Sequence, residues 1–567
     1  MTTASIRQGL ARWMPIIGWL PDYDRSWLGA DLIAGFTIWG LLVPEMIAYA
    51  SLAGLPPQAG LYTLLASLVL YAVFGTSRHL VVAGTSASAV LVFSAVSGLH
   101  PKDPSAYAEL AAAMIIVTGI AFVLAGIARL GFITQFLSRP VMTGFIFGLA
   151  IFVTVSQLPK IFGIEKGEGD TVRQFFHVVA NLSRTSGVTV AVGVGAVALL
   201  FAVERFAPRV PGGLVVLVLG IAISYVFNLS SHGVATIGHI PSGFPSVTVP
   251  RPALSDLWVL IPSALGMLLV IYSEALGAAT TFADKHGYRI DPNQEMIALG
   301  LANIGSGLFG GLAAGGSLSQ SAVNDGAGAK SEASPLCASV LSLVTVLVLT
   351  PLFHDLPEAV LAALIIHAVS HLMRADELRE YYRLIPSEFW LGVITLVGVI
   401  VLDVLPGLLI GVLLSLVLVV GRASRPKVSV LGESTEVPGA YVDVDRHPDA
   451  RGLNGVLVVR PDAPLFYANA QAVRDAIEAS TNNDGPITAV VIDLDANDRL
   501  DITSADHLVK LQRGLASRGV QLCLVHVHAP AMAIAKASGL LDAVGTEHVF
   551  PNIDAAVQWA RRDPKPN

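Results

Sequence analysis

The chain has 567 residues, of which 53% are hydrophobic and only 14% are charged, and its mean hydropathy is +0.66. Soluble globular chains carry much more charge, so we place most of this protein in a lipid bilayer. The net charge of −7 and the lack of a long basic block argue against nucleic acid as a partner. Cys337 and Cys523 are the only cysteines and lie far apart, which argues against a disulfide framework or a cysteine metal site.

The N-terminal segment, residues 1–27, contains Arg7 and Arg12 but no short apolar core followed by a cleavage site, so we expect no removable signal peptide. From Leu28 to about Gly421, apolar stretches follow one another with short loops. Several fall short of the roughly 20 residues that a full crossing needs. We predict fourteen membrane segments, at about residues 29–52, 58–75, 79–98, 107–128, 131–158, 187–206, 212–228, 258–283, 293–311, 316–328, 334–353, 357–372, 388–403 and 405–421.

An even number of crossings places both ends of the chain on one side of the membrane. Cytoplasmic loops collect Lys and Arg, and the loops that contain Arg78, Arg129 and Lys285 fit this rule. The predicted outside loop at about 159–186 also carries basic residues and fits it less well. We therefore expect both ends to be cytoplasmic.

Two polar interruptions resemble each other, at residues 84–90 and 316–323, where small and hydroxyl-bearing side chains break apolar sequence. Backbone groups at membrane depth must be buried in protein or line a cavity, and matched interruptions in two halves are typical of a transporter's binding site. The alternative is that these small residues only let helices pack closely.

Each half also places an acid in its first helix: Glu45 lies 41 residues before Ser86, and Glu274 lies 43 residues before Ser317. The segment that starts at 79 would enter from the cytoplasm and the one at 316 from outside, so the two halves form inverted repeats. Their helix N-termini would then meet near the bilayer midplane. Facing N-termini present unpaired N–H groups and positive dipole ends, which favour an anion between them.

The chain resembles the SulP family of anion transporters. The resemblance spans nearly the whole chain and is carried by residues 31–35, 43–50, 53–62, 291–295, 300–307 and 316–324. It implies an α-helical membrane protein of about fourteen segments in two inverted seven-segment repeats, with a core domain that slides against a gate domain. It also implies a small cytoplasmic α/β STAS domain. We assign a transport domain to 28–421, with repeats at about 28–228 and 256–421, a linker to 422–445 and the STAS domain to 446–567.

By this resemblance the anion lies between the third and tenth segments. The implied contacts are backbone N–H groups and hydroxyls of Ser86, Ala87, Ser88, Ser317, Leu318 and Ser319. Many family members have an arginine at the position of Gln320, so this site lacks a positive charge. A neutral Gln still donates hydrogen bonds, and loss of the cation weakens divalent binding more than monovalent binding.

Glu45 and Glu274 are the candidate ion-coupling residues, because an ionisable side chain inside a membrane segment is costly and usually functional. In the family, the acid at the position of Glu45 is thought to couple transport to protons. Sodium-coupled bicarbonate members use an acid in the eighth segment, near Glu274, which Thr280 and Thr281 follow. The structural alternatives are a helix end facing water for Glu45 and a hydrogen bond to the tenth segment for Glu274.

We expect no cofactor and no metal site, because His354, His367 and His371 do not stand with Asp or Cys at a familiar ligand spacing. The chain has no nucleotide-binding glycine loop and no nucleophile with a matched base, so we predict no enzyme and no catalytic residue. The partners that we expect are a small inorganic or organic anion, the lipid bilayer and a second copy in a homodimer.

The tail alternates buried strands, at 456–459, 489–494 and 521–525, with helices at 470–480, 504–518 and 531–539. Residues 464–470 and 501–505 resemble the STAS domain, in which a Ser or Thr at the position of Thr503 can be phosphorylated. Asp501 or Thr503 is therefore a regulatory candidate, with the alternative that either one caps the following helix.

The resemblance implies a secondary active transporter of sulfate, bicarbonate or a dicarboxylate in the plasma membrane, or the inner membrane of a bacterium, with proton symport through Glu45 and an elevator-like motion. Alternatives are a sodium-coupled bicarbonate transporter or an anion exchanger. A nucleobase–proton symporter fits less well because it normally lacks a STAS tail. A more distant alternative is an anion-responsive membrane protein that does not transport.

Overall fold

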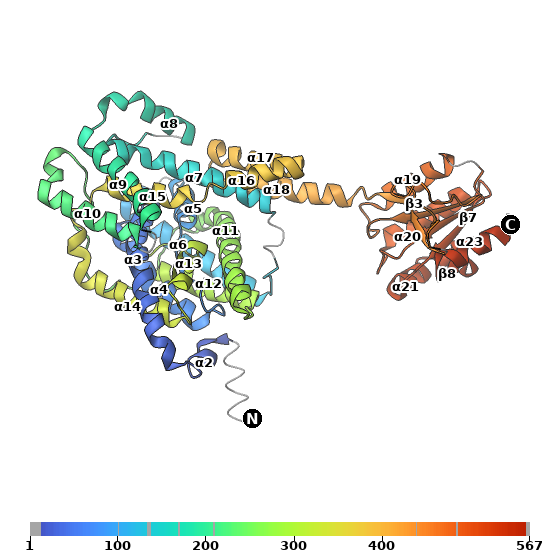
Figure 1. The fold of residues 1–567 in the computed structure, drawn as a ribbon, viewed down its shortest axis with the longest axis horizontal. Coiled ribbons are helices and arrows are strands. Elements are labelled where there is room, and N and C mark those ends of the chain that lie inside the picture. Colours follow the sequence, from blue (N-terminus) through green and yellow to red (C-terminus); the bar gives the residue numbers. More distant parts are fainter. Residues whose placement is uncertain are drawn as a thin grey trace. The chain divides into compact units, whose positions relative to one another are not determined.

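The computed structural model describes residues 13–99, 101–132, 138–167, 170–207, 210–437, 439–483 and 486–562 (Figure 1). The chain forms two compact units, Met1–Ser415 and Leu416–Asn567. The described part begins with the short helix α2 (Ile16–Trp19) and a 3-10 turn at Arg25–Trp27. Arg7 and Arg12 of the predicted N-terminal segment lie outside the described residues.

The N-terminal unit is helical, and nine described helical stretches of the chain are long and apolar enough to cross a membrane. They contain α3 (Leu28–Leu52), α4 (Pro57–Phe74), α6 (Pro104–Ile127), α7 (Arg139–Phe162), α9 (Gly187–Phe206), α11 (Leu254–His286), α14 (Ala333–Val344), α15 (Glu358–Ser370) and α18 (Val404–Ala423). Three shorter apolar helices are α5 (Ser86–Ser97), α10 (Gly212–Phe227) and α17 (Pro386–Leu402). With α12 (Pro292–Leu308) and α13 (Leu318–Gly326) they match the fourteen predicted segments.

Two further helices lie in connections that the apolar pattern does not predict, α8 (Thr171–Ala180) and α16 (Ala375–Leu384). Helix α8 lies in the long loop at 159–186, and α16 has charged residues in both its first and last turns. Neither helix is continuously apolar, so hydropathy alone does not reveal them.

Glycines let several membrane helices approach closely. A Cβ atom on Gly144 of α7 would overlap the carbonyl group of Gly392 on α17. On α6 and α12, a Cβ on either Gly119 or Gly300 would lie 2.7 Å from the carbonyl oxygen of the other. Small residues at such crossings are the usual means of helix association where lipid supplies no hydrophobic drive.

Gly144→Ala is therefore expected to lower the thermal stability of the detergent-solubilised protein by about 1–3 kcal/mol, because the added methyl group forces α7 away from α17. Gly195→Ala is the matched control, since Gly195 also lies inside a membrane helix but has open space around its Cβ position. The control should be neutral or stabilising by up to about 1 kcal/mol. Equal melting temperatures for the two variants would contradict this account of the α7–α17 contact.

Two short strands cross at the centre of the N-terminal unit. Strand β1 (Val82–Gly84) pairs with β2 (Ala314–Gly316) in antiparallel register, with Val82 opposite Gly316 and Gly84 opposite Ala314. All their residues are buried. Each strand leads into a half-helix, α5 after β1 and α13 after β2. The pairing thus fixes the two half-helix N-termini relative to each other.

Side chains of neighbouring helices complete the hydrogen bonding of this crossing, as buried backbone requires. Asn303 on α12 accepts from the N–H of Ala314 at 2.9 Å and donates to its carbonyl at 2.8 Å. Ser67 on α4 donates to the carbonyl of Val82 at 2.8 Å, and the N–H of Val81 donates to Ser321 on α13 at 2.9 Å. Polar side chains of α4, α12 and α13 therefore form hydrogen bonds with backbone groups in and beside β1 and β2 that would otherwise be unpaired.

The C-terminal unit is a sheet with the strand order β4-β3-β5-β6-β7-β8. Its parallel part comprises β5 (Val456–Pro461), β6 (Ala489–Asp493), β7 (Gln521–Val525) and β8 (Val549–Phe550). One face packs against α19 (Ala470–Asn483), α20 (Ile502–Ala516), α21 (Ala529–Ala537) and α22 (Leu540–Val544), and the other face packs against α23 (Ile553–Arg562). Helices on both faces explain why these strands are mostly apolar.

The sheet begins earlier than the predicted domain start at residue 446. Strands β3 (Val428–Glu433) and β4 (Tyr441–Asp443) lie inside the predicted linker 422–445 and pair antiparallel with each other, while β3 also pairs with β5. Lys427 donates to Asp443 at 3.0 Å, and this hydrogen bond holds the pKa of Asp443 below its usual range. The charged residues of this stretch therefore lie in a hairpin at the edge of the sheet and not in a linker.

Candidate functional site

Helix α5 begins with a capping box in which Thr85 and Ser88 satisfy each other. The N–H of Ser88 donates to Thr85 Oγ1 and the N–H of Thr85 donates to Ser88 Oγ, both at 3.1 Å. Ser88 Oγ also donates to the carbonyl of Ala313 at 2.8 Å. The N–H groups of Ser86 and Ala87 receive no acceptor from the described residues. Helix α5 therefore offers two backbone donors, and the polar groups of Ser88 are already engaged.

Helix α13 begins in the same way, with Ser317 as its N-cap. Ser317 Oγ accepts from the N–H of Gln320 at 3.4 Å and lies 3.0 Å from Ser319 Oγ. Within the described chain, the N–H groups of Leu318 and Ser319 also have no acceptor. Leu318 and Ser319 are exposed, whereas Ser86 and Ala87 are buried. The predicted contact residues thus come together in two N-terminal turns, and the turn of α13 is the accessible one.

Gln320 connects the N-terminus of α13 to the predicted coupling acid. Its Nε2 donates to Glu45 Oε2 at 2.9 Å and to the carbonyl of Gly84 at 3.3 Å. Gln320 is only 2% exposed, and its Oε1 is buried without a partner among the described groups. Glu45 therefore contacts the first turn of α13, which argues against the alternative of a helix end that faces water. The sequence does not reveal this contact because the two residues lie 275 positions apart.

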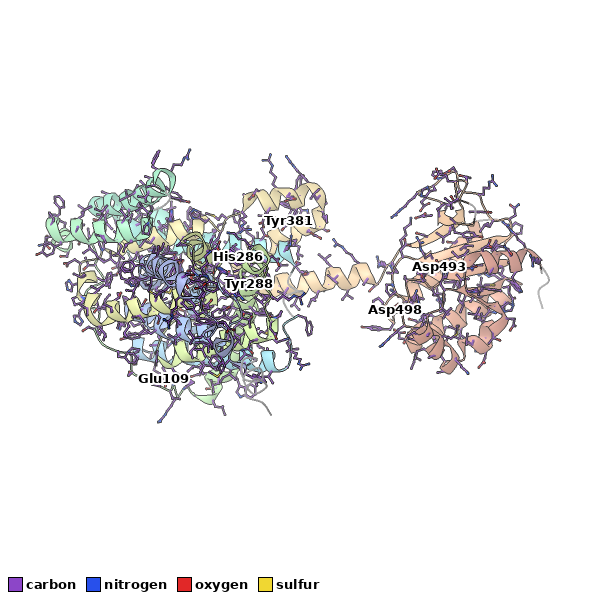
Figure 2. The ribbon with its side chains drawn as sticks, turned by 60° about the horizontal axis from the view of Figure 1, so that its bottom comes forward. Glu109, His286, Tyr288, Tyr381, Asp493 and Asp498 are labelled. Carbon is purple, nitrogen blue, oxygen red and sulfur yellow. The ribbon has the colours of Figure 1, made fainter. Side chains whose placement is uncertain are left out.

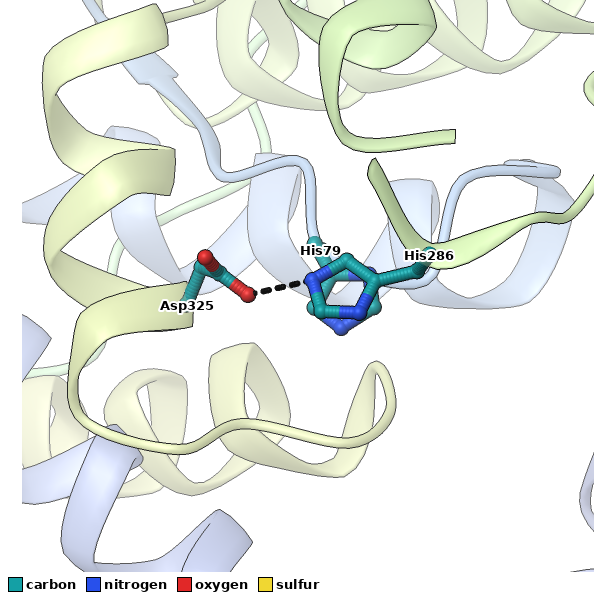
Figure 3. Close-up of side chains that lie close together, drawn as sticks. All are labelled: His79, His286 and Asp325. Carbon is teal, nitrogen blue, oxygen red and sulfur yellow. Dashed lines mark hydrogen bonds and ion pairs between the residues drawn. The ribbon is translucent and has the colours of Figure 1, made fainter. Parts of the chain in front are cut away.

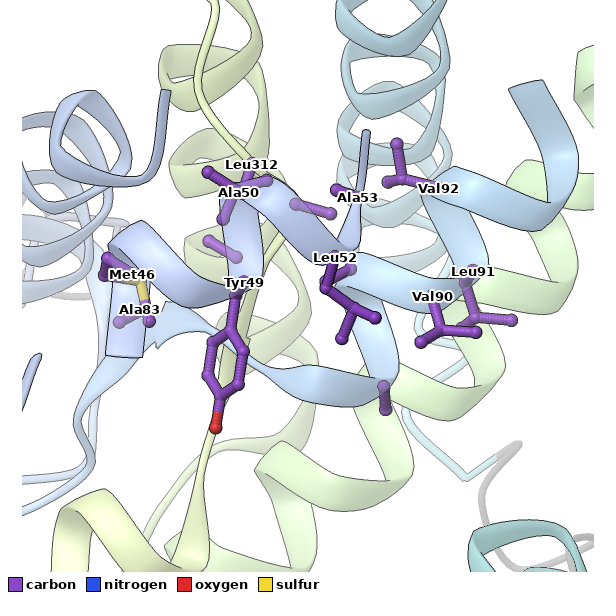
Figure 4. Packing of buried hydrophobic residues seen from close by; sticks show 14 of the residues in the cluster. Met46, Tyr49, Ala50, Leu52, Ala53, Ala83, Val90, Leu91, Val92 and Leu312 are labelled. Carbon is purple, nitrogen blue, oxygen red and sulfur yellow. The ribbon is translucent and has the colours of Figure 1, made fainter. Parts of the chain in front are cut away.

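Glu274 lies on α11, where Ala275 packs against Gly316 of β2. No described group forms a hydrogen bond with the Glu274 carboxylate, so the alternative of a structural bond to α13 has no support. Thr280 and Thr281 donate to carbonyls of their own helix. Tyr49 lies within electrostatic range of both Glu45 and Glu274, and its ring extends away from α3 in Figure 4.

A second polar cluster joins the loop after α4 to the ends of α11 and α13. The rings of His79 and His286 stack with centroids 4.2 Å apart, and His286 Nε2 lies 2.6 Å from Asp325 Oδ1 (Figure 3). Lys285 also bonds to Asp325, and the Tyr288 hydroxyl lies 3.3 Å from His79 Nδ1. Figure 2 labels His286 and Tyr288 in the N-terminal unit. His286 and Asp325 lie 39 residues apart in the sequence. Their contact depends on the tertiary fold.

In the C-terminal unit, Asp501 is the N-cap of α20 and Thr503 is exposed. Asp501 Oδ1 accepts from the N–H of Ser504 at 2.7 Å, and Oδ2 accepts from the N–H of Tyr467 at 2.7 Å. Capping therefore belongs to Asp501 and not to Thr503. Thr503 stays a candidate for modification, because a helix N-terminus favours added negative charge.

Asp501→Ala is expected to destabilise the C-terminal unit by about 1–2 kcal/mol through loss of the cap. Cys523 can report this change, because it is fully buried and burial raises the pKa of its thiol to about 12. In a Cys337→Ser background, thiol labelling of Cys523 should become about 5 to 30 times faster with Asp501→Ala. Thr503→Ala is the control and should leave the labelling rate unchanged. Equal acceleration by both substitutions would contradict the assignment of the cap.

Comparison with known proteins covers both units. The sulfate permease family matches residues 28–395, and the STAS domain matches residues 447–556. A probable sulfate transporter of Mycobacterium tuberculosis H37Rv is 33% identical over 97% of this chain and 99% of that protein. The chloroplastic sulfate transporter 4.1 of Arabidopsis thaliana is 30% identical over 98% and 84%. The murine Slc26a9 anion transporter, solved in an inward-facing state, has a TM-score of 0.91 at 25% identity, over 99% of this chain and 96% of that one. The predicted helical multi-span membrane fold with a C-terminal α/β STAS domain is confirmed.

Proposed function

The chain belongs to the sulfate permease family, a family of anion transporters rather than enzymes, and we propose that it is a secondary active symporter that couples anion uptake to protons through Glu45. One observation carries the proposal: Gln320, in the first turn of α13, donates directly to Glu45. The protein's anion substrate and its multi-pass membrane fold follow from the family. The coupling ion, the mechanism and the choice of anion are proposed.

The paired N-termini of α5 and α13 supply the anion site. Four backbone N–H groups, two on each half-helix, have no described acceptor, and positive dipole ends add to their pull on an anion. We keep Ser86, Ala87, Leu318 and Ser319 as the main contacts. Ser88 and Ser317 serve mainly to cap the two helices.

Proton coupling follows from the charge of the Glu45 carboxylate, which changes when the carboxylate binds a proton. An ionised Glu45, one glutamine side chain away from the α13 N-terminus, repels an anion bound there, and protonation removes the repulsion. Because linkage is reciprocal, the anion and the proton then each strengthen the binding of the other. The unpaired Oε1 of Gln320 can accept from a protonated Glu45 after rotation of the amide. The same pair thus accommodates both charge states.

The packing of the helices supports an elevator-like motion. Helices α3 and α4 pack with α12 and α14, and α6 packs with α11 and α12. In the other group, α7 packs with α15 and α17, and α9 packs with α10 and α15. Both half-helices and both acids belong to the first group. A site carried wholly by one group can move against the other without being taken apart.

Sulfate is the first substrate to test, because the named relatives include sulfate transporters. Bicarbonate stays in the test, since a site with Gln320 in place of arginine loses less affinity for monovalent than for divalent anions. A dicarboxylate stays in the test as the third anion class that the resemblance implies. A plasma-membrane location, a cytoplasmic STAS domain and a homodimer remain predictions from the resemblance. Sodium coupling through Glu274 is less favoured, because no described hydroxyl bonds to its carboxylate.

The test is uptake of labelled sulfate, bicarbonate and fumarate into proteoliposomes, with and without an inward proton gradient and with and without sodium. We expect one of these anions to accumulate only under the proton gradient. Uptake that depends on sodium would replace the proton by the alternative coupling ion. Exchange that ignores both gradients would contradict symport, and the absence of flux for every anion would contradict transport of this substrate class.

A further inference from the structure

We propose that Glu204, His367 and His371 form a binding site for a divalent transition-metal ion such as Zn²⁺, between the ends of α9 and α15. His367 Nε2 lies 2.9 Å from Glu204 Oε2, and His371 Nε2 lies 2.8 Å from Glu204 Oε1. The donor atoms of the three residues lie within 4.8 Å of one another. This cluster is separate from the anion site and does not depend on which substrate is carried.

The local fold explains the convergence. His367 and His371 lie four residues apart at the end of α15, so both project from one face of that helix. Glu204 lies near the end of α9, which packs against α15. A carboxylate from α9 therefore meets both imidazoles. The sequence conceals this contact because Glu204 precedes His367 by 163 residues, and the proposal therefore revises the expectation of no metal site.

The second ring nitrogen of His371 is held as in known metal sites. His371 Nδ1 lies 2.9 Å from the carbonyl oxygen of His367, so it donates its proton there. Without an ion, Nε2 donates to Glu204 Oε1; a metal ion that displaces this proton would meet the Nε2 lone pair, which points into the cluster. A backbone carbonyl is a common outer partner of a metal-ligating histidine, because it fixes both the tautomer and the ring orientation.

Ring geometry distinguishes this cluster from the one formed by His79, His286 and Asp325. The rings of His79 and His286 are nearly parallel, 11° apart at 4.2 Å. An imidazole lone pair lies in its ring plane, so stacked rings cannot both point at one ion. The rings of His367 and His371 cross at 71° with centroids 4.9 Å apart, which permits convergence.

The carboxylates differ as well. Lys285 already pairs with Asp325, whereas no described Lys or Arg forms an ion pair with Glu204. A protein cation beside a carboxylate competes with a metal ion for it. The Glu204 cluster is thus the better cation site of the two.

The donor set and spacing suit Zn²⁺. Two histidines and one glutamate form a known zinc ligand set, and zinc–ligand bonds of about 2.0–2.1 Å in a tetrahedron place ligand atoms roughly 3.3 Å apart. The present N–O separations of 2.8 and 2.9 Å need to widen only slightly. A surface groove lined by Phe201, Ala202, Glu204, Arg205 and Phe206 gives the ion access. A bound ion would clamp α9 to α15.

The test is metal binding by the full-length, detergent-solubilised protein without a polyhistidine tag. Zn²⁺ is measured by equilibrium dialysis and Co²⁺ by its visible absorption. We expect about one tightly bound ion per chain, a tetrahedral cobalt spectrum, and a rise in melting temperature with Zn²⁺. His367→Ala and His371→Ala should each weaken binding at least tenfold, in keeping with loss of one ligand.

His354→Ala is the matched control, since His354 is an exposed histidine beside a single carboxylate, Asp355, at 2.9 Å. It should bind the ion as the parent chain does. Glu204→Gln gives a second test if a histidine variant fails to fold, because it keeps the size of the side chain and removes its charge. Absence of binding by the parent chain, or equal affinity in parent and cluster variants, would overturn the site and leave a hydrogen-bonded Glu–His pair only.

Discussion

Glu45→Gln is expected to abolish proton-driven accumulation of the anion, reducing uptake under an inward proton gradient to the level seen without one. Glutamine has almost the same shape and can still bond to Gln320, so the anion site should persist. Only the exchangeable proton is lost. Coupling free energies between sites are typically about 1–3 kcal/mol, so total uptake under the gradient should fall roughly 5- to 150-fold, to the level without a gradient.

Glu109→Gln is the matched control for this measurement. Glu109 is an exposed glutamate on α6 that accepts from the N–H of Arg251 at 2.6 Å (Figure 2). It lies in the same unit but makes no contact with Gln320. Its variant should keep gradient-driven uptake. Unchanged gradient dependence in Glu45→Gln would remove Glu45 from the mechanism and redirect attention to Glu274.

Ser319→Trp is expected to block transport. An indole in the first turn of α13 covers the exposed N–H groups of Leu318 and Ser319, which have no other described acceptor. Hydrogen bonds to a charged group contribute about 1.5–3 kcal/mol each, so loss of two weakens anion binding by at least about a hundredfold. The measurement is concentration-dependent uptake in the same proteoliposomes.

Two controls make the Ser319→Trp result specific. Ser319→Ala keeps the backbone donors and should transport within a few-fold of the parent chain. Ser183→Trp adds a side chain of the same size at an exposed serine outside the half-helices, and it should leave anion uptake unchanged. Normal transport by Ser319→Trp would move the binding site away from the α5–α13 pair, whatever the outcome for Glu45.

The sequence predicts most of the membrane helices because each one needs a long apolar run, and such runs are visible locally. The half-helices α5 and α13 are also predictable from the sequence, because both begin with similar runs of small and hydroxyl-bearing residues. The short strands β1 and β2 were not, because three residues carry no periodic pattern. Their existence depends on pairing between residues such as Val82 and Gly316, far apart in the chain.

The candidate site shows the same division. The residues of the two N-terminal turns are predictable from their composition, yet which donors remain free is not. Ser88 and Ser317 look equivalent to Ser86 and Ser319 in sequence, but the Ser88 hydroxyl accepts from the N–H of Thr85 in the capping box and the Ser317 hydroxyl accepts from the N–H of Gln320. Gln320 is expected at the anion site from the resemblance, but its bond to Glu45 is visible only in the fold. Such choices depend on three-dimensional competition for hydrogen-bond partners.

The β1–β2 crossing also constrains how the protein is made. During synthesis, residues 82–84 enter the bilayer long before residues 314–316 leave the ribosome. Until then the backbone of β1 lacks the partner strand that it has in the finished fold, and its polar groups cannot stay bare in lipid. The early segments must therefore wait in a wet or protein-lined environment, such as the insertion machinery. Co-translational insertion of this chain ends in a late joining of its two halves.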